Sequence, residues 1–368
     1  MKSNTICLNM IVKDESEVIQ RSLASILPII DYWVIIDTGS TDRTQERIKE
    51  FMKNIPGELH ERPWVNFEHN RNEALTLAKT KGSYILFIDA DEEFIFEKNF
   101  VMPDLTHDFY IVRHQLRDND FQRISIIKND PSWTWVGVIH ETITHPRINQ
   151  LSFDYVSNVV NIYHEKGGNR SKDPHKYLKD AAILEKALVE DPTNARYAFY
   201  LAQTYFEGAR YHKALQAYEK RTKMDGNEQE RFWSYYRIAL IQEFHLKEDP
   251  EIFIQSYAKA YLHRPSRIEP LYYIASYYFN SGKYLINYLL IKIALAIPPS
   301  NDLILVERWM RDWALSYQLL QSAYTLGYYQ ESLDITNKLL ATKNVPIDRR
   351  ETLHKALPLI QQSCQKSI

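Results

Sequence analysis

The chain has 368 residues, of which 45% are hydrophobic, so it can bury a sizeable core and its length favours two domains. A formal net charge of −2 provides no basic field for nucleic acid, and we expect no nucleic-acid partner. The two cysteines, Cys7 and Cys364, lie at opposite ends of the chain, which argues against a disulfide framework and fits a reducing compartment.

Targeting segments are not evident. The apolar N-terminal run meets charged residues too early for a cleavable signal, and the longest apolar stretch, 284–299, contains Lys292 and is too short for a membrane span. We therefore expect a cytoplasmic protein without a membrane span. It could still be peripheral to a membrane, or delivered elsewhere without a cleavable signal.

Short apolar runs alternate with amphipathic stretches from residue 5 to about 166. Strand and helix patterns in alternation predict an α/β domain with a mostly parallel sheet. Three later apolar runs lack helices between them, and we expect hairpins or a mixed sheet edge there. The predicted strands are 5–12, 32–37, 57–64, 83–92, 108–116, 123–129 and 156–164, and the predicted helices are 15–27, 41–55 and 69–82, the last closed by Gly82.

Strand patterns end at about residue 172, and a helical template recurs after that point. Residues 194–221 and 269–299 carry small and aromatic residues at the packing positions of a tetratricopeptide repeat, and weaker copies lie between and after them. A generic helical bundle is the alternative. We place the domains at 1–170 and 171–368. A hydrophobic C-terminal face, 357–368, favours a homodimer through the repeat domain.

Acidic residues follow two of the predicted strands. Asp37 ends one strand, and Asp89 and Asp91 end the buried run 83–92. The carboxyl ends of parallel strands meet at one edge of the sheet, and side chains at i and i+2 of an extended segment point the same way. The pattern predicts a site for a divalent cation held by carboxylate oxygens. The alternative is an ordinary loop whose acids reach water.

The segment "DTGSTDRT" (37–44) joins the second strand to a helix. Gly39 permits a tight turn, and Ser40, Thr41 or Asp42 can cap the helix. Backbone amides at a helix start would suit an anion. The segment lacks the lysine and glycine spacing of a Walker loop, and the chain contains no G-x-G-x-x-G dinucleotide motif.

Taken together, these motifs resemble the family-two glycosyltransferases, which have the Rossmann-like GT-A fold. The resemblance lies in 10–44, "NRNEAL", "YILFIDADEE", "WTWVGVIHE" and "IYHEKGG", in that order. With helical repeats behind them, the chain looks like the branch that carries a C-terminal tetratricopeptide domain. Some members of that branch glycosylate peptides at oxygen or sulfur.

The resemblance implies a set of contacts to the nucleotide sugar. In the family, the end of the first strand contacts the nucleoside, which corresponds here to the segment from Val12 to Glu15, with Glu15 at the ribose or base. Asp37 is implied to lie near the base, usually uracil. Arg71 of "RNEAL" corresponds to a nucleotide contact, and Asp89 to a ribose contact.

The resemblance also implies a metal centre. Asp91, with Asp89, would hold Mn²⁺ or Mg²⁺, which bridges the donor diphosphate. A histidine near the end of the domain would complete the metal shell. His164 in "YHEKGG" is the first choice and His140 is the second.

The implied chemistry is transfer of a hexose with inversion at the anomeric carbon. The acceptor loses a proton as it attacks, and Glu141 is the expected general base, with His140 beside it. Glu92 and Glu93 are rival bases. Trp133 and Trp135 share one face of an extended segment, so Trp135 is a candidate sugar contact, although core packing is the commoner role of a tryptophan.

The expected partners are a donor such as UDP-glucose or UDP-GlcNAc and an acceptor that is a peptide, a protein or a glycan. Stacked repeats form grooves that hold extended peptides, which favours a peptide acceptor. One alternative is a non-catalytic tetratricopeptide scaffold with a relic nucleotide-binding domain. Another is a nucleotidyltransferase, but the first strand and its loop lack the glycine-rich segment that such enzymes use.

Overall fold

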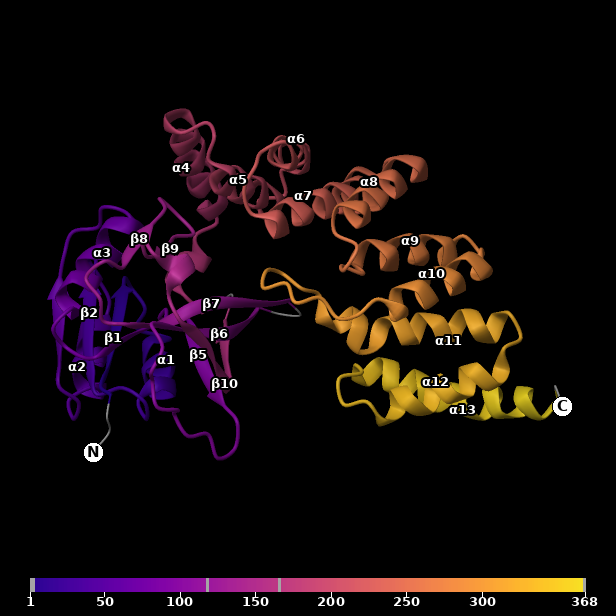
Figure 1. Cartoon of the computed structure of the whole chain (residues 1–368), viewed down its shortest axis with the longest axis horizontal. Helices are drawn as coiled ribbons and strands as arrows, with labels where there is room; N and C mark the ends of the chain where they lie inside the picture. Colours follow the sequence, from indigo (N-terminus) through magenta and orange to yellow (C-terminus); the bar gives the residue numbers. More distant parts are fainter. Residues whose placement is uncertain (1–3, 117–118, 165–166, 367–368) are drawn as a thin grey trace. The chain divides into compact units, whose positions relative to one another are not determined.

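The computed structural model describes residues 4–116, 119–164 and 167–366 (Figure 1). It divides into two compact units, one ending at Gly208 and the other beginning at Ala209. The proposed domain boundary at 170/171 lies where strands give way to helices. The compact units divide later, because the first two long helices after that point belong to the unit that contains the sheet.

The first unit is built on a mixed eight-stranded sheet in the order β3-β2-β1-β4-β7-β6-β10-β5. Strands β1 to β4 run parallel to one another, and β7 inserts antiparallel between β4 and β6. The expected mixed edge is therefore confirmed. The strands are β1 Ile6–Val12, β2 Tyr32–Asp37, β3 Gly57–Glu61, β4 Tyr84–Phe87, β5 Glu92–Phe96, β6 Phe109–Leu116, β7 Asn119–Lys128 and β10 Phe153–Tyr163, with β8 Thr134–Val136 and β9 Thr142–Thr144 forming a separate hairpin.

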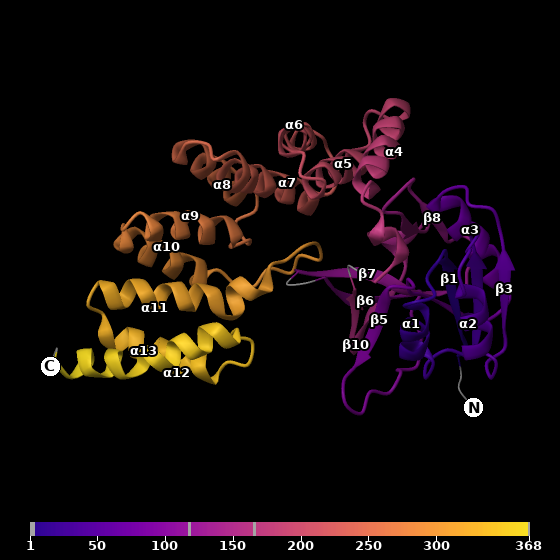
Figure 2. The same cartoon turned by 180° about the vertical axis from the view of Figure 1, so that it is seen from behind.

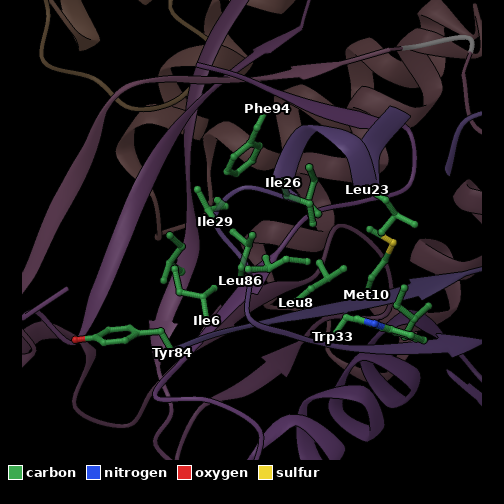
Figure 3. Close-up of a cluster of buried hydrophobic side chains, with 14 of the residues drawn as sticks. Ile6, Leu8, Met10, Leu23, Ile26, Ile29, Trp33, Tyr84, Leu86 and Phe94 are labelled. Atoms are coloured by element: carbon green, nitrogen blue, oxygen red, sulfur yellow. The ribbon is translucent and has the colours of Figure 1, made fainter. Parts of the chain in front are cut away.

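Layers cover both faces of the sheet. On one face, β1 presents Ile6, Leu8 and Met10 to α1 (Ile19–Ile26), which contributes Leu23 and Ile26 (Figure 3), and α2 (Thr44–Phe51) joins the same core. On the other face, α3 (Phe67–Ala78) lies beside β8, as both overall views show (Figures 1 and 2). Because both faces are covered, β1, β2 and β4 consist mostly of apolar residues, with Asn9 and Asp37 as buried polar exceptions.

Among the boundaries that differ from the sequence prediction, those of α3 and of the run 83–92 bear on the site. Helix α3 begins after Asn66, whose side chain accepts a hydrogen bond from the His69 amide, and it ends at Ala78, so Gly82 does not close it. The run 83–92 is not one strand: β4 stops at Phe87, and a second strand, β5, starts at Glu92. The acids of this run therefore lie in a connection between two strands.

Helices make up the rest of the chain, and the expected repeat fold is confirmed. Within each unit, the helices pack against their neighbours in sequence, and the small repeat positions Ala202, Ala214, Ala275 and Ala294 are buried. The weaker repeats contain π-helical turns at Ile241–Leu246 and Met310–Ala314. The helices are α4 Lys176–Glu190 and α5 Ala195–Glu207 in the first unit, then α6 Tyr211–Thr222, α7 Glu228–Leu240, α8 Pro250–His263, α9 Glu269–Asn280, α10 Tyr284–Ala296, α11 Leu315–Thr325, α12 Tyr329–Ala341 and α13 Ile347–Lys366.

Residues 284–299, the longest apolar stretch of the sequence, form α10 and its exit. Among the described residues, no helix combines the length and the hydropathy needed to cross a membrane. At the C-terminal end, Leu359 is exposed while Leu353 and Ile360 are buried. The homodimer stays a prediction.

Candidate active site

Hydrogen bonds join the loops that follow β1 and β2 into one surface. Both the amide and the hydroxyl of Thr38 donate to the Val12 carbonyl, at 2.9 and 3.0 Å. The Asp14 amide donates to Ser40 Oγ at 2.8 Å, and the Thr41 amide donates to Asp14 Oδ1 at 2.6 Å. The Val12 carbonyl is thus occupied within the protein. The two loops that the sequence assigns to the nucleoside form one structure.

In the turn after β2, backbone amides donate hydrogen bonds to side chains of the same segment. Asp37 Oδ1 accepts hydrogen bonds from the amides of Gly39 and Ser40 at 2.9 and 2.7 Å, and Gly39 has a φ of 99°, which favours glycine. The Thr44 amide donates to Asp42 Oδ1. The expected anion site at the start of α2 is therefore not free, because carboxylates of the same motif already satisfy these amides. Asp37 is fully buried, and its second oxygen, Oδ2, has no hydrogen-bond partner.

The acids after β4 lie on a tight turn. The Glu92 amide donates to the Asp89 carbonyl at 3.1 Å, and the Asp89 amide donates to Glu92 Oε2 at 3.0 Å. Ser22 Oγ of α1 also donates to the Asp89 carbonyl, at 3.0 Å. Since the segment turns instead of continuing as a strand, the expectation that Asp89 and Asp91 point the same way as i and i+2 does not hold. Each contacts a different neighbour.

Asp89 belongs to a buried ion cluster with Arg71. Arg71, on α3, donates from Nη2 to Asp89 Oδ1 at 2.7 Å and from Nε to Glu141 Oε1, so one guanidinium joins both carboxylates. Burial alone would raise the pKa of Asp89, but the charges of Arg71 and Arg123 outweigh it and hold that pKa at about 2. The structure thus brings together Arg71, Asp89 and Glu141, three residues far apart in sequence.

Asp91 has a different environment. Burial, followed by the charges of Asp89 and Glu92, raises its pKa to about 7. No lysine or arginine of the described residues lies within ion-pair distance of it. The backbone of Gly168 lies against its carboxylate so closely that a Cβ on Gly168 would be 2.7 Å from Asp91 Oδ2. Asp91 is therefore the acid of the turn that still lacks a positive partner.

Glu15 lies on the same side as Asp91. Its carboxylate accepts the amide of Asn169 at 3.2 Å, and its own amide donates to Thr44 Oγ1. Burial raises the pKa of Glu15 to about 7; the Asn169 amide lowers it, and the charge of Asp91 raises it further. The segment that begins at Gly168 thus contacts two carboxylates, Asp91 and Glu15, whose pKa values are both raised.

The two candidate histidines occupy separate environments. The amide of His164 donates to the Asp91 carbonyl at 3.1 Å, but its ring Nε2 lies 2.9 Å from Glu93 Oε2. His140 is exposed, with a φ of 53°, and its ring stacks on Tyr200 of α5 with a centroid separation of 4.1 Å. Neither imidazole contacts Asp91 in this structure, although His164 is adjacent to it through the main chain.

Trp135 is part of the core. Its side chain is 4% exposed, it packs edge-on against Phe87, and the Arg71 guanidinium lies 4.8 Å from its ring centroid. Trp133 is similarly buried. The expectation of an exposed aromatic face for a sugar is therefore corrected, because β8 and the residue before it place both rings in the core between α3 and the sheet. Through its ring, Trp135 supports Arg71.

The rival bases and one unexpected residue complete the cluster. Glu92 is 2% exposed and pairs with Arg123 of β7 at 2.8 Å, while Glu93 pairs with His164. Both rivals are paired with a neighbouring side chain, as Glu141 is with Arg71, so the choice of Glu141 as the base stays a prediction. Sequence reasoning missed Arg123. Its signal was a charged residue within the apolar run "RISIIK", which indicates a buried ion partner.

We tested whether the residues fit a divalent cation. Among the described residues, no group of three or more His, Cys, Asp or Glu side chains lies close enough to hold a metal alone. Mg²⁺ in phosphate-binding sites is usually held by one or two carboxylates plus substrate phosphates and waters. A half-buried Asp91, which has no lysine or arginine partner among the described residues, fits that kind of site, in which the ligand brings part of the coordination shell.

Comparison with known proteins gives one family match and two related sequences. Residues 7–100 match the family model described as glycosyl transferase family 2. An uncharacterized glycosyltransferase of Rickettsia bellii is 24% identical over 199 residues, which cover 54% of this chain and 58% of that protein. A TPR repeat-containing protein of Synechococcus elongatus is 40% identical over 93 residues, which cover 25% of this chain and 22% of that protein.

Solved structures resemble about half of the chain. MamA is 14% identical, with a TM-score of 0.36 over 49% of this chain and 92% of that chain. A thermophilic TPR protein of Thermus thermophilus is 17% identical, with a TM-score of 0.34 over 50% of this chain and 91% of that chain. These TM-scores are too low to support a conclusion about the fold. The assignment of helix pairs rests on the helices of this structure. The chain therefore carries a glycosyl transferase family 2 domain at its N-terminus, followed by helix pairs of the tetratricopeptide type.

Proposed function

We propose that the chain is a metal-dependent, inverting glycosyltransferase that moves a hexose from a UDP-linked donor to a peptide, protein or glycan acceptor. The observation that carries the proposal is Asp91: a half-buried carboxylate without a lysine or arginine partner among the described residues, at the edge where β1, β2 and β4 end. Asp89, beside it, is already neutralised by arginine. Such an arrangement suits a cation that arrives with a diphosphate.

The nucleotide would lie over the joined loops after β1 and β2. Asp37, at the end of β2, would lie near the base, usually uracil. Glu15 would contact the ribose or base, and Asp89 the ribose, with Arg71 close to the nucleotide. These roles agree with a family 2 domain that begins at residue 7.

Transfer requires a group that takes the acceptor proton. Glu141 Oε1 is held by Arg71, which leaves Oε2 to accept the proton of the attacking hydroxyl or thiol. The acceptor atom then forms a bond to the anomeric carbon from the face opposite the departing diphosphate. A divalent cation held by Asp91, if bound, would supply positive charge to that leaving group.

The repeat half is the proposed binding site for a protein or peptide acceptor, because stacked helix pairs commonly bind extended segments. The proposal for the acceptor rests only on the presence of these repeats. Donor chemistry and acceptor choice are separable, since a glycosyltransferase can hydrolyse its donor slowly without an acceptor.

The test is a panel of nucleotide-sugar donors incubated with the full chain and scored for released nucleoside diphosphate, with and without EDTA. We expect release from a UDP-sugar that requires Mn²⁺ or Mg²⁺ and that Asp91→Ala abolishes without unfolding the protein. Release that survives EDTA would remove the metal from the mechanism. No release from any donor, together with no binding of UDP, would favour the non-catalytic scaffold.

A further inference from the structure

Glu92 is the most completely enclosed acid of the turn after β4. Its side chain is 2% exposed, although it is charged and borders the candidate active site. Oε2 accepts a hydrogen bond from the Asp89 amide at 3.0 Å, so the Glu92 side chain closes the turn. The Glu92 amide donates a hydrogen bond to the Asp89 carbonyl at 3.1 Å, so a backbone hydrogen bond closes the same turn. Asp91 lies inside this doubly closed turn.

Arg123 of β7 neutralises Glu92 and also faces Asp89. Its Nη2 donates to both carboxylate oxygens of Glu92, at 3.0 and 2.8 Å, and its Nη1 lies 3.6 Å from Asp89 Oδ2. Arg123 can reach both acids because β7 runs antiparallel beside β4. Together with Arg71, it supplies Asp89 and Glu92 with positive charge, whereas Asp91 has no ion-pair partner within the described parts of the chain.

A third side chain, His114, lies next to Glu92. His114 of β6 is fully buried, and its Nδ1 lies 3.7 Å from Glu92 Oε1. Asn161 Nδ2 of β10 faces the same Nδ1 at 3.0 Å, and Nε2 faces Ser125 Oγ at 3.1 Å. An amide donor at Nδ1 places the ring proton on Nε2, so Nδ1 has no proton to donate to Glu92 and the ring only borders that carboxylate. Side chains of β6, β7 and β10 thus surround Glu92, and Arg123 provides its ion pair.

We infer that Glu92 and Arg123 are positioning residues: they hold the turn in the shape that presents Asp91, un-neutralised, to a divalent cation. The inference rests on the proposed function, since it assigns the cation to Asp91. Neither residue contacts the reacting atoms. Arg123 also satisfies the neighbouring acids, so that no lysine or arginine of the described residues is left to pair with Asp91.

The experiment uses the full chain and measures Mn²⁺ binding by isothermal titration calorimetry in the presence of saturating UDP. Glu92→Gln keeps an acceptor for the Asp89 amide but removes the charge that holds Arg123. Arg123→Met keeps the length of the side chain and removes both contacts. Because outer-shell partners set the orientation of metal ligands, we expect each variant to weaken Mn²⁺ binding about tenfold or more. Arg123→Lys should recover part of the loss.

The matched control is Arg221→Met in the second unit. Arg221 is also fully buried and pairs with a buried carboxylate, Glu230, at 3.4 Å. The Arg221→Met variant should have lower thermal stability and unchanged Mn²⁺ affinity. This control separates a general loss of stability from a local change at the turn. Near-ultraviolet circular dichroism identifies any variant that fails to fold, and Glu92→Gln, the mildest change, then supplies the test.

Each outcome separates the inference from the proposed function. Donor turnover by the wild-type chain with unchanged Mn²⁺ affinity in Glu92→Gln and Arg123→Met would overturn the positioning role alone. A wild-type chain that binds UDP without Mn²⁺ and releases no nucleoside diphosphate would overturn the proposed function, and the positioning role with it. Weakened binding in both variants, partial recovery by Arg123→Lys and an unaffected control would support both.

Discussion

Replacing Asp91 by asparagine should stabilise the protein while it removes the activity. The aspartate ionises near pH 3.8 in an unfolded chain, but burial, Asp89 and Glu92 raise its pKa to about 7 in the folded protein. Ionisation therefore disfavours the folded state, and the penalty grows from pH 3.8 until it is complete above pH 7. The full shift corresponds to about 4 kcal/mol. Because the side chain is partly exposed, we expect about 2–4 kcal/mol at pH 8.

The assay is urea unfolding of the wild-type chain and Asp91→Asn in EDTA, at several values between pH 5 and pH 8. The variant should be more stable at pH 8, and the gap should be less than half as large at pH 5, where the folded aspartate is mostly protonated. Asp225→Asn is the control, because Asp225 is fully exposed and should show no widening gap. Equal stability of wild type and Asp91→Asn at pH 8 would refute the reasoning.

Three further predictions concern the same cluster. Gly168→Ala keeps an allowed backbone (φ −73°, ψ 152°) but places a methyl group 2.7 Å from Asp91 Oδ2, so Mn²⁺ titration of activity should show weaker activation and urea unfolding a loss of about 1–3 kcal/mol; an unchanged Mn²⁺ response would contradict this contact. Trp135→Phe shrinks a buried ring and should lower the free energy of unfolding by about 1–3 kcal/mol with an unchanged KM for the donor; a raised KM at unchanged stability would restore the sugar contact. Glu141→Gln should retain its contact with Arg71 and UDP binding, measured calorimetrically, but lose about 10²–10⁴ in kcat for acceptor transfer; full activity would exclude Glu141 as the base.

Sequence patterns predicted the parallel core of the first unit well, because β1, β2 and β4 are apolar on both faces and the helices between them have clear periodicity. The same patterns placed Asp37, Asp89 and Asp91 after strands that end at one edge of the sheet, although β4 stops at Phe87, earlier than the apolar run suggested. The repeat helices were also predictable, since alanine at positions such as 202 and 275 is required where two helices approach closely.

The turn at Asp89 and the pairing of Arg123 with Glu92 could not be predicted in the same way. An apolar run that continues into acids reads as one strand, and only the hydrogen bonds between Asp89 and Glu92 show that the chain turns. The pairing of Glu92 with Arg123 depends on β7 inserting beside β4, which is a choice of topology and not of local pattern. The hydrogen bonds from backbone amides to Asp37 and Asp42 were easier to predict from the sequence, since aspartate commonly accepts hydrogen bonds from the backbone of its own turn.

The doubly closed turn between β4 and β5 has a consequence for how this segment can vary. Its shape depends on the Asp89 amide reaching the Glu92 carboxylate and on the Glu92 amide reaching the Asp89 carbonyl. An extra residue between them would break both links at once and rotate Asp91 away from Gly168. The spacing of this segment is therefore under tighter constraint than its individual side chains, and a deletion or insertion there would be more damaging than any single exchange.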